Sequence, residues 1–255
     1  MPAHVHRQPL IYCPPGEHLP AAFAQDLQAV CPFDLTPERP LLGPYFIWRE
    51  EKLQLYTDHA KRQGLTELSF DFAEYWRELQ RQRGRSSHGP LAQALGIKGK
   101  PSWRVFDATC GSGKDSFLIG SFGAKVVAAE ENPWIFTLLR DALRRLPVLP
   151  FPWELCFGRA EMLLKARQDI DSIYFDPMYP SAKKKALPRK EMQYFRDLLP
   201  ADHCPQTTLT ELLNCQAQRV VIKRPLNAPP LLPNVKHAYK GKTARYDMYM
   251  SHETR

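Results

Sequence analysis

The sequence has no run of eighteen apolar residues, so it contains no candidate for a membrane-spanning helix. Met1 to Arg7 form no hydrophobic signal core, which argues against secretion. The six cysteines include no C-x-x-C pair, and neither a zinc ribbon nor a disulfide framework is indicated. These absences predict a cytoplasmic protein with reduced thiols, no membrane partner and no bound metal.

The composition is that of a globular chain. Its 255 residues are 44% hydrophobic and 11% aromatic, which is too apolar for a disordered protein. A chain of this length can bury a full α/β core together with a small additional module. No internal repeat or low-complexity tract is present.

The net charge of +8 is concentrated in the last third of the chain. Residues 1–176 carry 21 basic and 21 acidic side chains, whereas residues 177–255 carry 14 basic and only 6 acidic ones. A polyanionic partner would therefore meet the C-terminal third. A solvated basic surface that serves solubility is an equally simple interpretation of the charge alone.

The first part of the chain is irregular in pattern. The proline-rich residues 1–44 predict short elements and loops. Residues 53–85 have a more helical pattern, and residues 91–95 predict one short helix that Gly96 ends. We therefore expect a small N-terminal module over residues 1–94 and a second domain over residues 95–255.

From Trp103 onward, short apolar runs alternate with helical segments. Helices are expected over 116–122 and 133–146, and strands over the ranges 103–108, 124–130, 155–157, 173–176, 219–223 and 246–250. This alternation predicts an α/β Rossmann-like fold, with a mostly parallel sheet and helices on both faces. In such sheets ligands bind at the carboxyl ends of the strands, where the motifs described next are expected to lie.

A glycine-rich turn follows the first of these strands, over residues 107–115. It fails as a phosphate-binding P-loop, because Ala108 replaces the first glycine and Asp115 stands where Ser or Thr should bind magnesium. It also fails as a dinucleotide fingerprint, since Ser116 occupies the third glycine position. A third interpretation is a strand–helix turn whose glycines are incidental.

A turn of this kind suits S-adenosylmethionine, which has no phosphate and whose ammonium and sulfonium favour nearby carboxylates. Gly111 and Gly113 allow a ligand to approach the backbone closely. Asp107 precedes the turn, and Glu130 ends the next predicted strand, where an acid can accept both hydroxyls of a ribose. These four residues are candidate cofactor contacts.

The stretch from Ile173 to Pro180 resembles the [D/N/S]-P-P-[Y/F] signature of amino-methyltransferases, with Met178 in place of the second proline. An exocyclic amine of a base is a poor nucleophile because its lone pair is delocalised into the ring. Hydrogen-bond acceptors on its two N–H groups free that lone pair. The Asp176 carboxylate and the Pro177 carbonyl are candidate acceptors, and Tyr179 is a candidate for stacking on the base. The plain alternative is a strand end followed by a proline-rich loop.

Three basic groups lie after this motif, and each is expected near the carboxyl edge of the sheet. Phosphates bound there would bring a base to Tyr179, although any single lysine can equally be a solvated surface residue. The candidate RNA contacts are Lys183, Lys184, Lys185, Lys223, Arg224, Lys240, Lys242 and Arg245.

With these residues in place, the chain resembles the bacterial RsmJ family, the 16S ribosomal RNA guanine-N2 methyltransferases. The resemblance covers residues 96–250 in order, whereas the first 45 residues match nothing usable. It is carried by the blocks Gly96–Gly99, Asp107–Phe117, Glu130–Pro133, Asp176–Pro180, Lys190–Met192, Arg219–Pro225, Ala228–Pro230 and Lys240–Asp247.

The resemblance implies a Rossmann-like S-adenosylmethionine-dependent methyltransferase that acts on the small ribosomal subunit, with specificity of the guanine-1516 type. It implies cofactor contacts at Lys114, Asp115, Glu130, Glu131, Arg159, Ala160 and Asp176. The chain departs from the family pattern at Lys114, where arginine is expected, at Tyr179, where phenylalanine is common, and at Arg159–Ala160, where small hydroxyl residues are expected.

Other activities remain open from the residues alone. The signature serves any exocyclic amine, so N6-adenine or N4-cytosine methylation of nucleic acid is an alternative. A protein glutamine methyltransferase would use a related turn without needing the C-terminal charge. A catalytically silent RNA-binding protein of the same fold belongs to a different class, and titration with S-adenosylmethionine would distinguish it.

Overall fold

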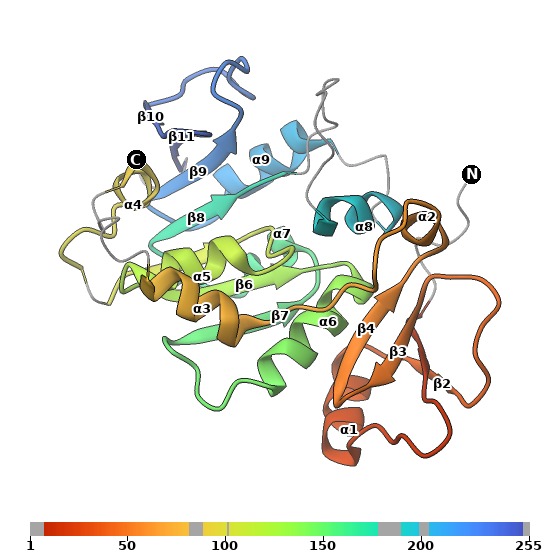
Figure 1. Ribbon diagram of the computed structural model, residues 1–255. Helices are drawn as coiled ribbons and strands as arrows, with labels where there is room; N and C mark the ends of the chain where they lie inside the picture. Colours follow the sequence, from red (N-terminus) through yellow and green to blue (C-terminus); the bar gives the residue numbers. More distant parts are fainter. Residues whose placement is uncertain (1–7, 82–88, 101, 178–189, 199–203, 252–255) are drawn as a thin grey trace. The chain divides into compact units, whose positions relative to one another are not determined.

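A computed structural model describes residues 8–81, 89–100, 102–177, 190–198 and 204–251, which fall into two compact units (Figure 1). The first unit consists of Met1–Phe72, Asn132–Val148 and Ser181–Asp202. The second consists of Ala73–Glu131, Leu149–Pro180 and His203–Arg255. The boundary expected between the modules over residues 1–94 and 95–255 stays a prediction.

The second unit is built on a seven-stranded sheet with the order β10-β11-β9-β8-β5-β6-β7. Five neighbouring strands are parallel, and β11 and β10 complete the sheet in antiparallel orientation. Their bounds are β5 (Arg104–Asp107), β6 (Lys125–Glu130), β7 (Trp153–Phe157), β8 (Ser172–Phe175), β9 (Arg219–Arg224), β10 (His237–Lys240) and β11 (Arg245–Met250). The chain goes from β5 to β6 on one side and reaches β8 on the other, so the sheet has a switch point at β5, where ligands bind in folds of this kind.

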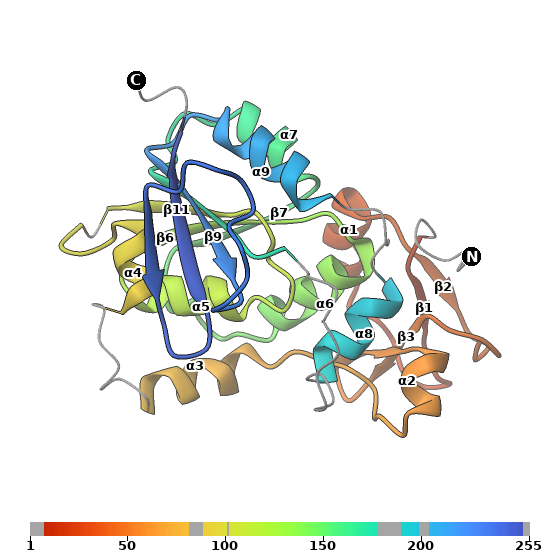
Figure 2. The same cartoon turned by 90° about the horizontal axis from the view of Figure 1, so that it is seen from above.

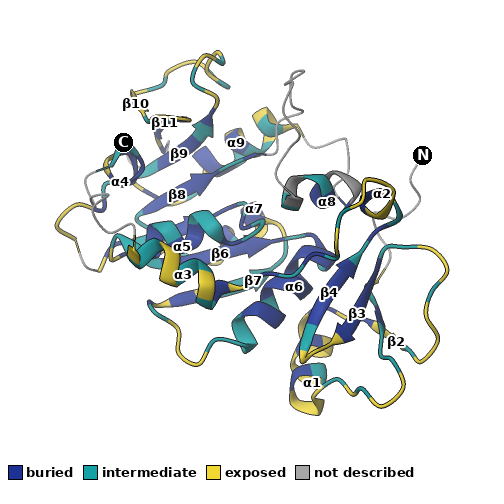
Figure 3. Cartoon of the chain, in the orientation of Figure 1, coloured by how far each residue is buried: buried dark blue, intermediate teal, exposed yellow. Residues whose placement is uncertain are grey.

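Helices cover both faces of this sheet, as Figure 2 shows. One face carries α7 (Ala160–Lys165) and α9 (Pro205–Leu213), and the other carries α4 (Pro90–Leu95) and α5 (Lys114–Ser121). The central strands are buried on both faces (Figure 3), which explains why they are almost continuously apolar in sequence. The expected fold class, a mostly parallel sheet between helices, is confirmed.

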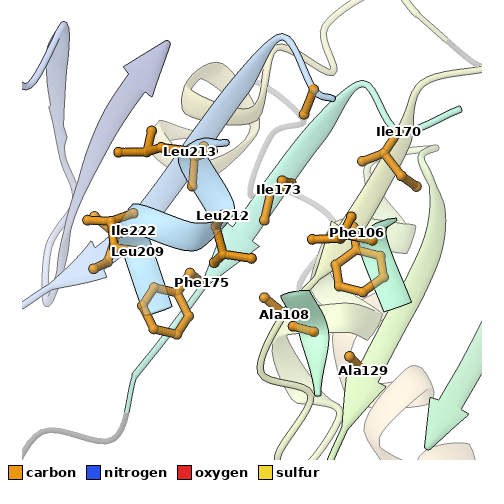
Figure 4. Close-up of a cluster of buried hydrophobic side chains, with 14 of the residues drawn as sticks. Phe106, Ala108, Ala129, Ile170, Ile173, Phe175, Leu209, Leu212, Leu213 and Ile222 are labelled. Atoms are coloured by element: carbon orange, nitrogen blue, oxygen red, sulfur yellow. The ribbon is translucent and has the colours of Figure 1, made fainter. Parts of the chain in front are cut away.

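The core beneath α7 and α9 follows from the alternation of side chains along each strand. Phe106, Ile173 and Ile222 project to this face from three adjacent strands and pack with Leu209 and Leu212 of α9 (Figure 4). The intervening residues therefore point to the opposite face. Asp107 and Tyr174 are among them, and this is the face on which the polar site described below is built.

Aromatic packing fixes α5, the helix that begins at the glycine turn. The Phe117 ring centroid lies 4.9 Å from that of Trp153 and 5.1 Å from that of Phe151. Trp76 of α3 (Phe72–Arg81) lies 6.3 Å from Phe117. A Cβ atom at Gly120 would lie 2.3 Å from the Phe151 ring, so this position in the helix accepts glycine alone without rearrangement. The amino end of α5 is thereby held in place.

The short helix α4 ends as the sequence predicted. Gly96 adopts the left-handed conformation, with φ of 75°, that suits a glycine after a helix. Trp103 then ties α4 to the sheet, because its indole N–H donates to the Leu95 carbonyl at 2.9 Å and lies 3.0 Å from the Ser172 hydroxyl of β8.

The first unit contains a four-stranded sheet with the order β2-β1-β3-β4. Its strands are β1 (Leu10–Tyr12), β2 (Asp34–Thr36), β3 (Tyr45–Arg49) and β4 (Lys52–Tyr56), and its helices are α1 (Ala21–Val30), α2 (Asp58–Arg62), α6 (Pro133–Arg144) and α8 (Lys190–Leu198). The buried Asp141 carboxylate on α6 accepts the Leu53 amide of β4 at 3.1 Å. The helical expectation was wrong for residues 53–56, which form β4. In the part of the chain that the structure describes, no helix is long and apolar enough to span a membrane.

Candidate functional site

The candidate site lies where parallel strands of the seven-stranded sheet end. Asp107 ends β5, Glu130 ends β6, Asp176 directly follows β8, and Lys223 is the penultimate residue of β9. Because these strands are parallel and adjacent, their carboxyl ends meet at one edge of the sheet. Residues that are far apart in the sequence therefore share one site.

The glycine turn is fastened to the end of β6. The Gly111 amide donates to Glu130 Oε2 at 2.9 Å, and the Cys110 amide donates to the Ala129 carbonyl at 3.0 Å. Gly111 and Gly113 have φ values of 54° and 75°, in the region that favours glycine. The expectation that these glycines form a tight turn into α5 is confirmed.

Asp107 is completely buried beneath this turn. Its carboxylate accepts the Ser116 hydroxyl at 2.5 Å and the Thr109 amide at 3.1 Å, so it links the strand to the turn and to α5. Burial raises the pKa of Asp107 to about 7, although both hydrogen bonds act in the opposite direction. Asp107 therefore shapes the turn from inside the protein.

The centre of the site is a lysine shared by two carboxylates. The Lys223 Nζ lies 2.8 Å from Asp115 Oδ2 and 2.8 Å from Asp176 Oδ2. The Tyr174 hydroxyl donates to the same Asp115 oxygen at 2.6 Å. The Asp176 amide donates to the Thr109 hydroxyl at 2.8 Å, which positions its backbone.

The electrostatics of this cluster set the charge of Asp176. Burial raises its pKa to about 6, the Lys223 ammonium opposes that rise, and the nearby Asp115 adds to it. Burial lowers the pKa of Lys223, but the two carboxylates outweigh burial and leave it above its ordinary value. When Asp176 is ionised, the two carboxylates and one ammonium carry one net negative charge, which suits a cationic ligand.

The remaining predicted cofactor contacts lie at neighbouring strand ends. The Gly158 amide donates to the Glu130 carbonyl at 3.0 Å, so the ends of β6 and β7 are joined. Arg159 follows and pairs with Glu161, and its Nε lies 4.0 Å from a Glu131 carboxylate oxygen. Ala160, the first residue of α7, is buried.

Lys114, the first residue of α5, is engaged with α3. Its carbonyl accepts the Tyr75 hydroxyl at 3.1 Å, and its ammonium lies 5.9 Å from the centroid of the Tyr75 ring. Lys114 and Asp115 are thus presented next to each other at the start of the helix, beside the glycine turn.

The predicted RNA contacts differ in their surroundings. Lys240 and Lys242 are exposed. Arg224 is buried and donates to the Pro229 carbonyl at 2.6 Å, and the buried Arg245 pairs with Asp247 at 2.6 Å. Lys223 belongs to the ion-pair cluster. Pro177 is described and buried, whereas Tyr179, Lys183, Lys184 and Lys185 lie outside the described residues.

The sequence interpretation missed three polar residues that shape the site: Thr109, Ser116 and Tyr174. In the sequence, Ser116 stands out only as the residue in place of a third glycine, and Tyr174 lies within the strand expected over 173–176. The alternation along β8 was the available signal, since it places Tyr174 on the same face as Asp176. Among the described residues, no group of three or more His, Cys, Asp or Glu side chains could hold a metal ion.

Both the sequence and the fold are similar to those of known methyltransferases. A family model of SAM-dependent methyltransferases matches residues 33–251. A protein of Bdellovibrio bacteriovorus named ribosomal RNA small subunit methyltransferase J is 36% identical over 220 residues, which cover 85% of each chain. The protein of the same name from Desulfotalea psychrophila is 30% identical and covers 89% of this chain and 91% of its own. The crystal structure of a SAM-dependent methyltransferase from Neisseria gonorrhoeae matches with a TM-score of 0.71 and 26% identity, over 95% of this chain and 96% of that chain.

The burial of Asp107 leads to a prediction about stability. Because its folded-state pKa lies above the ordinary value, the folded protein binds this proton more tightly than the unfolded chain does. The stabilisation is fully present below about pH 4 and is lost as the pH rises through about 7, a difference on the order of 4 kcal/mol. Asp107→Asn cannot ionise, so the melting temperature of the variant should rise relative to the wild type as the pH increases.

The measurement compares the thermal unfolding of both proteins at about pH 5 and about pH 8. Asp34, exposed on β2, provides the control: Asp34→Asn should change the melting temperature equally at both pH values. If the difference between Asp107→Asn and the wild type were the same at both values, ionisation of Asp107 would not limit stability.

Proposed function

This chain belongs to the family of SAM-dependent methyltransferases that includes the proteins named ribosomal RNA small subunit methyltransferase J, and we propose that it methylates the exocyclic N2 of a guanine in 16S ribosomal RNA. We extend the proposal to the position-1516 type of specificity that the resemblance implies. The expected partner is the small ribosomal subunit, and we expect the reaction to take place in the cytoplasm. The placement of Asp176 is the observation on which the chemistry rests.

Asp176 is held in place by two contacts within the protein. Its amide is bound to Thr109, and one of its carboxylate oxygens is bound by Lys223. About a third of its side chain, 32%, remains exposed, so the carboxylate is accessible to a substrate. Pro177 follows directly and supplies a carbonyl next to it.

These two acceptors are what methylation of an aromatic amine requires. Hydrogen bonds from the two N–H groups to the Asp176 carboxylate and the Pro177 carbonyl would draw the nitrogen toward tetrahedral geometry and free its lone pair. The methylated nitrogen must then lose a proton, which the Asp176 carboxylate that accepts its N–H would take. The site otherwise acts by orienting the reactants.

The residues around the turn fit S-adenosylmethionine. The Lys223 cluster carries one net negative charge, which favours an ammonium and a sulfonium. When bound, the cofactor supplies a methyl group made electrophilic by that sulfonium. We assign its ribose hydroxyls to Glu130, at the end of β6, and its remaining contacts to the residues beside the turn: Gly111, Gly113, Lys114, Asp115, Glu131, Arg159 and Ala160. Asp107 is buried beneath the turn, so we propose that it serves the cofactor by holding the turn in place.

The basic C-terminal third supports an RNA substrate. Lys240 and Lys242 are exposed and available for phosphates. We also propose RNA contacts for four residues that lie outside the described part of the chain: Tyr179, Lys183, Lys184 and Lys185. Three further proposed contacts already bind groups of the protein, so a phosphate would have to compete with those groups for them: Lys223, Arg224 and Arg245. A paired guanine keeps its N2 in a hydrogen bond, so the target base has to leave its stack.

The decisive test is to map the modified nucleotide. The protein is incubated with unmodified small ribosomal subunits and methyl-labelled S-adenosylmethionine, and the RNA is digested and analysed. The label should appear on N2 of one guanine of 16S RNA. Label on an adenine N6 or a cytosine N4 would instead support the alternative nucleic-acid activities, and binding of the cofactor without any transfer would indicate a silent RNA-binding protein.

Asp176→Ala should abolish nearly all turnover while S-adenosylmethionine binding weakens only partly. An acceptor that acts mainly in the transition state is worth on the order of 10²–10³ in rate, by analogy with deletions in oxyanion holes. Single-turnover methylation and cofactor titration provide the two measurements. Asp169→Ala, at the opposite end of β8, is the matched control and should retain activity. Near-normal methylation by Asp176→Ala would contradict the assignment.

The pH dependence of the rate should follow the ionisation of Asp176. Because the ionised carboxylate is the better acceptor, kcat/KM should fall as the pH decreases through about 6. Lys223 lowers the pKa of Asp176, so Lys223→Met should move this acidic limb to higher pH. Lys242→Met removes an exposed lysine and should leave the limb in place. An unchanged limb in Lys223→Met would show that another group controls the profile.

A further inference from the structure

A row of side chains crosses the sheet from Asp176 to its outer edge. Phe175 of β8 pairs with Ile222 of β9, and the residues that follow them, Asp176 and Lys223, are joined by an ion pair of 2.8 Å. Lys223 lies opposite Tyr246 of β11, and Tyr246 lies opposite Tyr239 of β10. Residues directly opposite each other on neighbouring strands project from the same face, so all four share one side of the sheet.

Tyr246 is the member of this row next to the ion-pair cluster. Its side chain is partly buried, and burial together with the charge of Asp115 raises its pKa, while Lys223 opposes the rise. The phenol is therefore neutral near pH 7. Helix α4 packs against β10 and β11, so the Tyr246 ring offers a partly exposed surface beside Asp176.

The row continues into an aromatic pair on β10, in which His237 is exposed and Tyr239 is partly exposed. This strand forms the edge of the sheet, and Figure 3 shows it in the colours of exposed and partly exposed residues. His237 and Tyr239 are two residues apart and project to the same face, with ring centroids 4.4 Å apart. Since neighbouring strands are about 4.8 Å apart, Tyr239 lies roughly 10 Å from the Lys223 position. That span accommodates the bases of a short stretch of nucleic acid.

The charges along this edge match a nucleic-acid backbone. Residues 236–246 contain no acidic side chain, and Lys236, Lys240 and Lys242 among them are exposed. Lys236 precedes the strand, and Lys240 follows Tyr239, so its side chain projects to the other face of this edge strand. A strand of RNA that followed this edge would meet aromatic rings on one face and ammonium groups at the ends and on the outer side of the strand.

We propose that Tyr246, Tyr239 and His237 form a platform on which the single-stranded nucleotides flanking the target base stack. The proposal rests on the proposed function, because it names how the RNA approaches Asp176. A base that leaves its stack exposes the faces of its neighbours, and aromatic side chains accept any base face without regard to sequence. The row then carries the strand from the edge of the sheet to the methylation site.

The experiment measures the affinity for a single-stranded RNA oligonucleotide and for unmodified small subunits, as a function of salt. Tyr239→Thr keeps the β-forming tendency of the strand but removes the ring, and it should weaken RNA binding about 5- to 100-fold, the effect of losing one stacked base. Tyr239→Phe retains the ring and should bind nearly as the wild type does. Titration with S-adenosylmethionine should give the same affinity for all three proteins, which shows that the fold and the cofactor site are intact.

Salt dependence separates stacking from charge. Tyr239→Thr should leave the slope of log affinity against log salt unchanged, whereas Lys242→Gln should reduce it by roughly 0.7 for single-stranded RNA. Lys165→Gln, an exposed lysine of α7 on the opposite face of the sheet, is the matched control and should alter neither quantity.

Wild-type affinity in Tyr239→Thr, or an equal loss in Tyr239→Phe, would overturn the platform. If the wild type methylates small subunits and Tyr239→Thr binds RNA as tightly as the wild type does, the platform is wrong while the proposed function stands. If the wild type transfers no methyl group to ribosomal RNA, the proposed function fails, and the binding series still decides whether the row binds RNA. The proposal would also be overturned if this edge bound a protein partner while neither Tyr239→Thr nor Lys242→Gln changed the affinity for RNA.

Discussion

The site depends on one ammonium group placed between two carboxylates. Lys223 comes from β9, Asp115 from the first turn of α5 and Asp176 from the turn after β8, so a single side chain joins three elements. Without it the two like charges would favour protonation of one carboxyl, and Asp176 would lose acceptor strength at neutral pH. The lysine therefore controls both the geometry of the site and the charge that a cationic cofactor meets.

The register of the sheet makes this arrangement possible. Pairing of Phe175 with Ile222 brings Asp176 opposite Lys223, and the same register continues through Tyr246 to Tyr239. A slip of one residue between β8 and β9 would turn one partner toward the face covered by α7 and α9, away from the other. The apolar residues on that face, including Ile173 and Ile222, oppose such a slip because it would expose them to the polar side.

Local patterns were enough to predict the fold class and the positions of the motifs. Apolar runs ending at acids located β5, β6 and β8, and the glycines located the turn, because these features depend on neighbouring residues. The antiparallel strand β10 escaped prediction because its residues are exposed and polar, and α7 and α9 were missed because they are short helices with few capping signals. Lys223 was predicted as a phosphate contact because its carboxylate partners, Asp115 and Asp176, are remote in sequence and only the folded register brings them together.

The division of the chain between the two units has a consequence for its synthesis. Asn132–Val148 and Ser181–Asp202 belong to the first unit, although β5, β6 and β8 of the second unit are built from residues between and before them. As the polypeptide emerges from the ribosome, the N-terminal sheet thus waits for α6 and then α8 before its unit is complete. The first unit is therefore complete only after Asp202 has been made, when β5, β6, β7 and β8 of the second unit are already synthesised, and the larger sheet is finished later still, when β9, β10 and β11 follow.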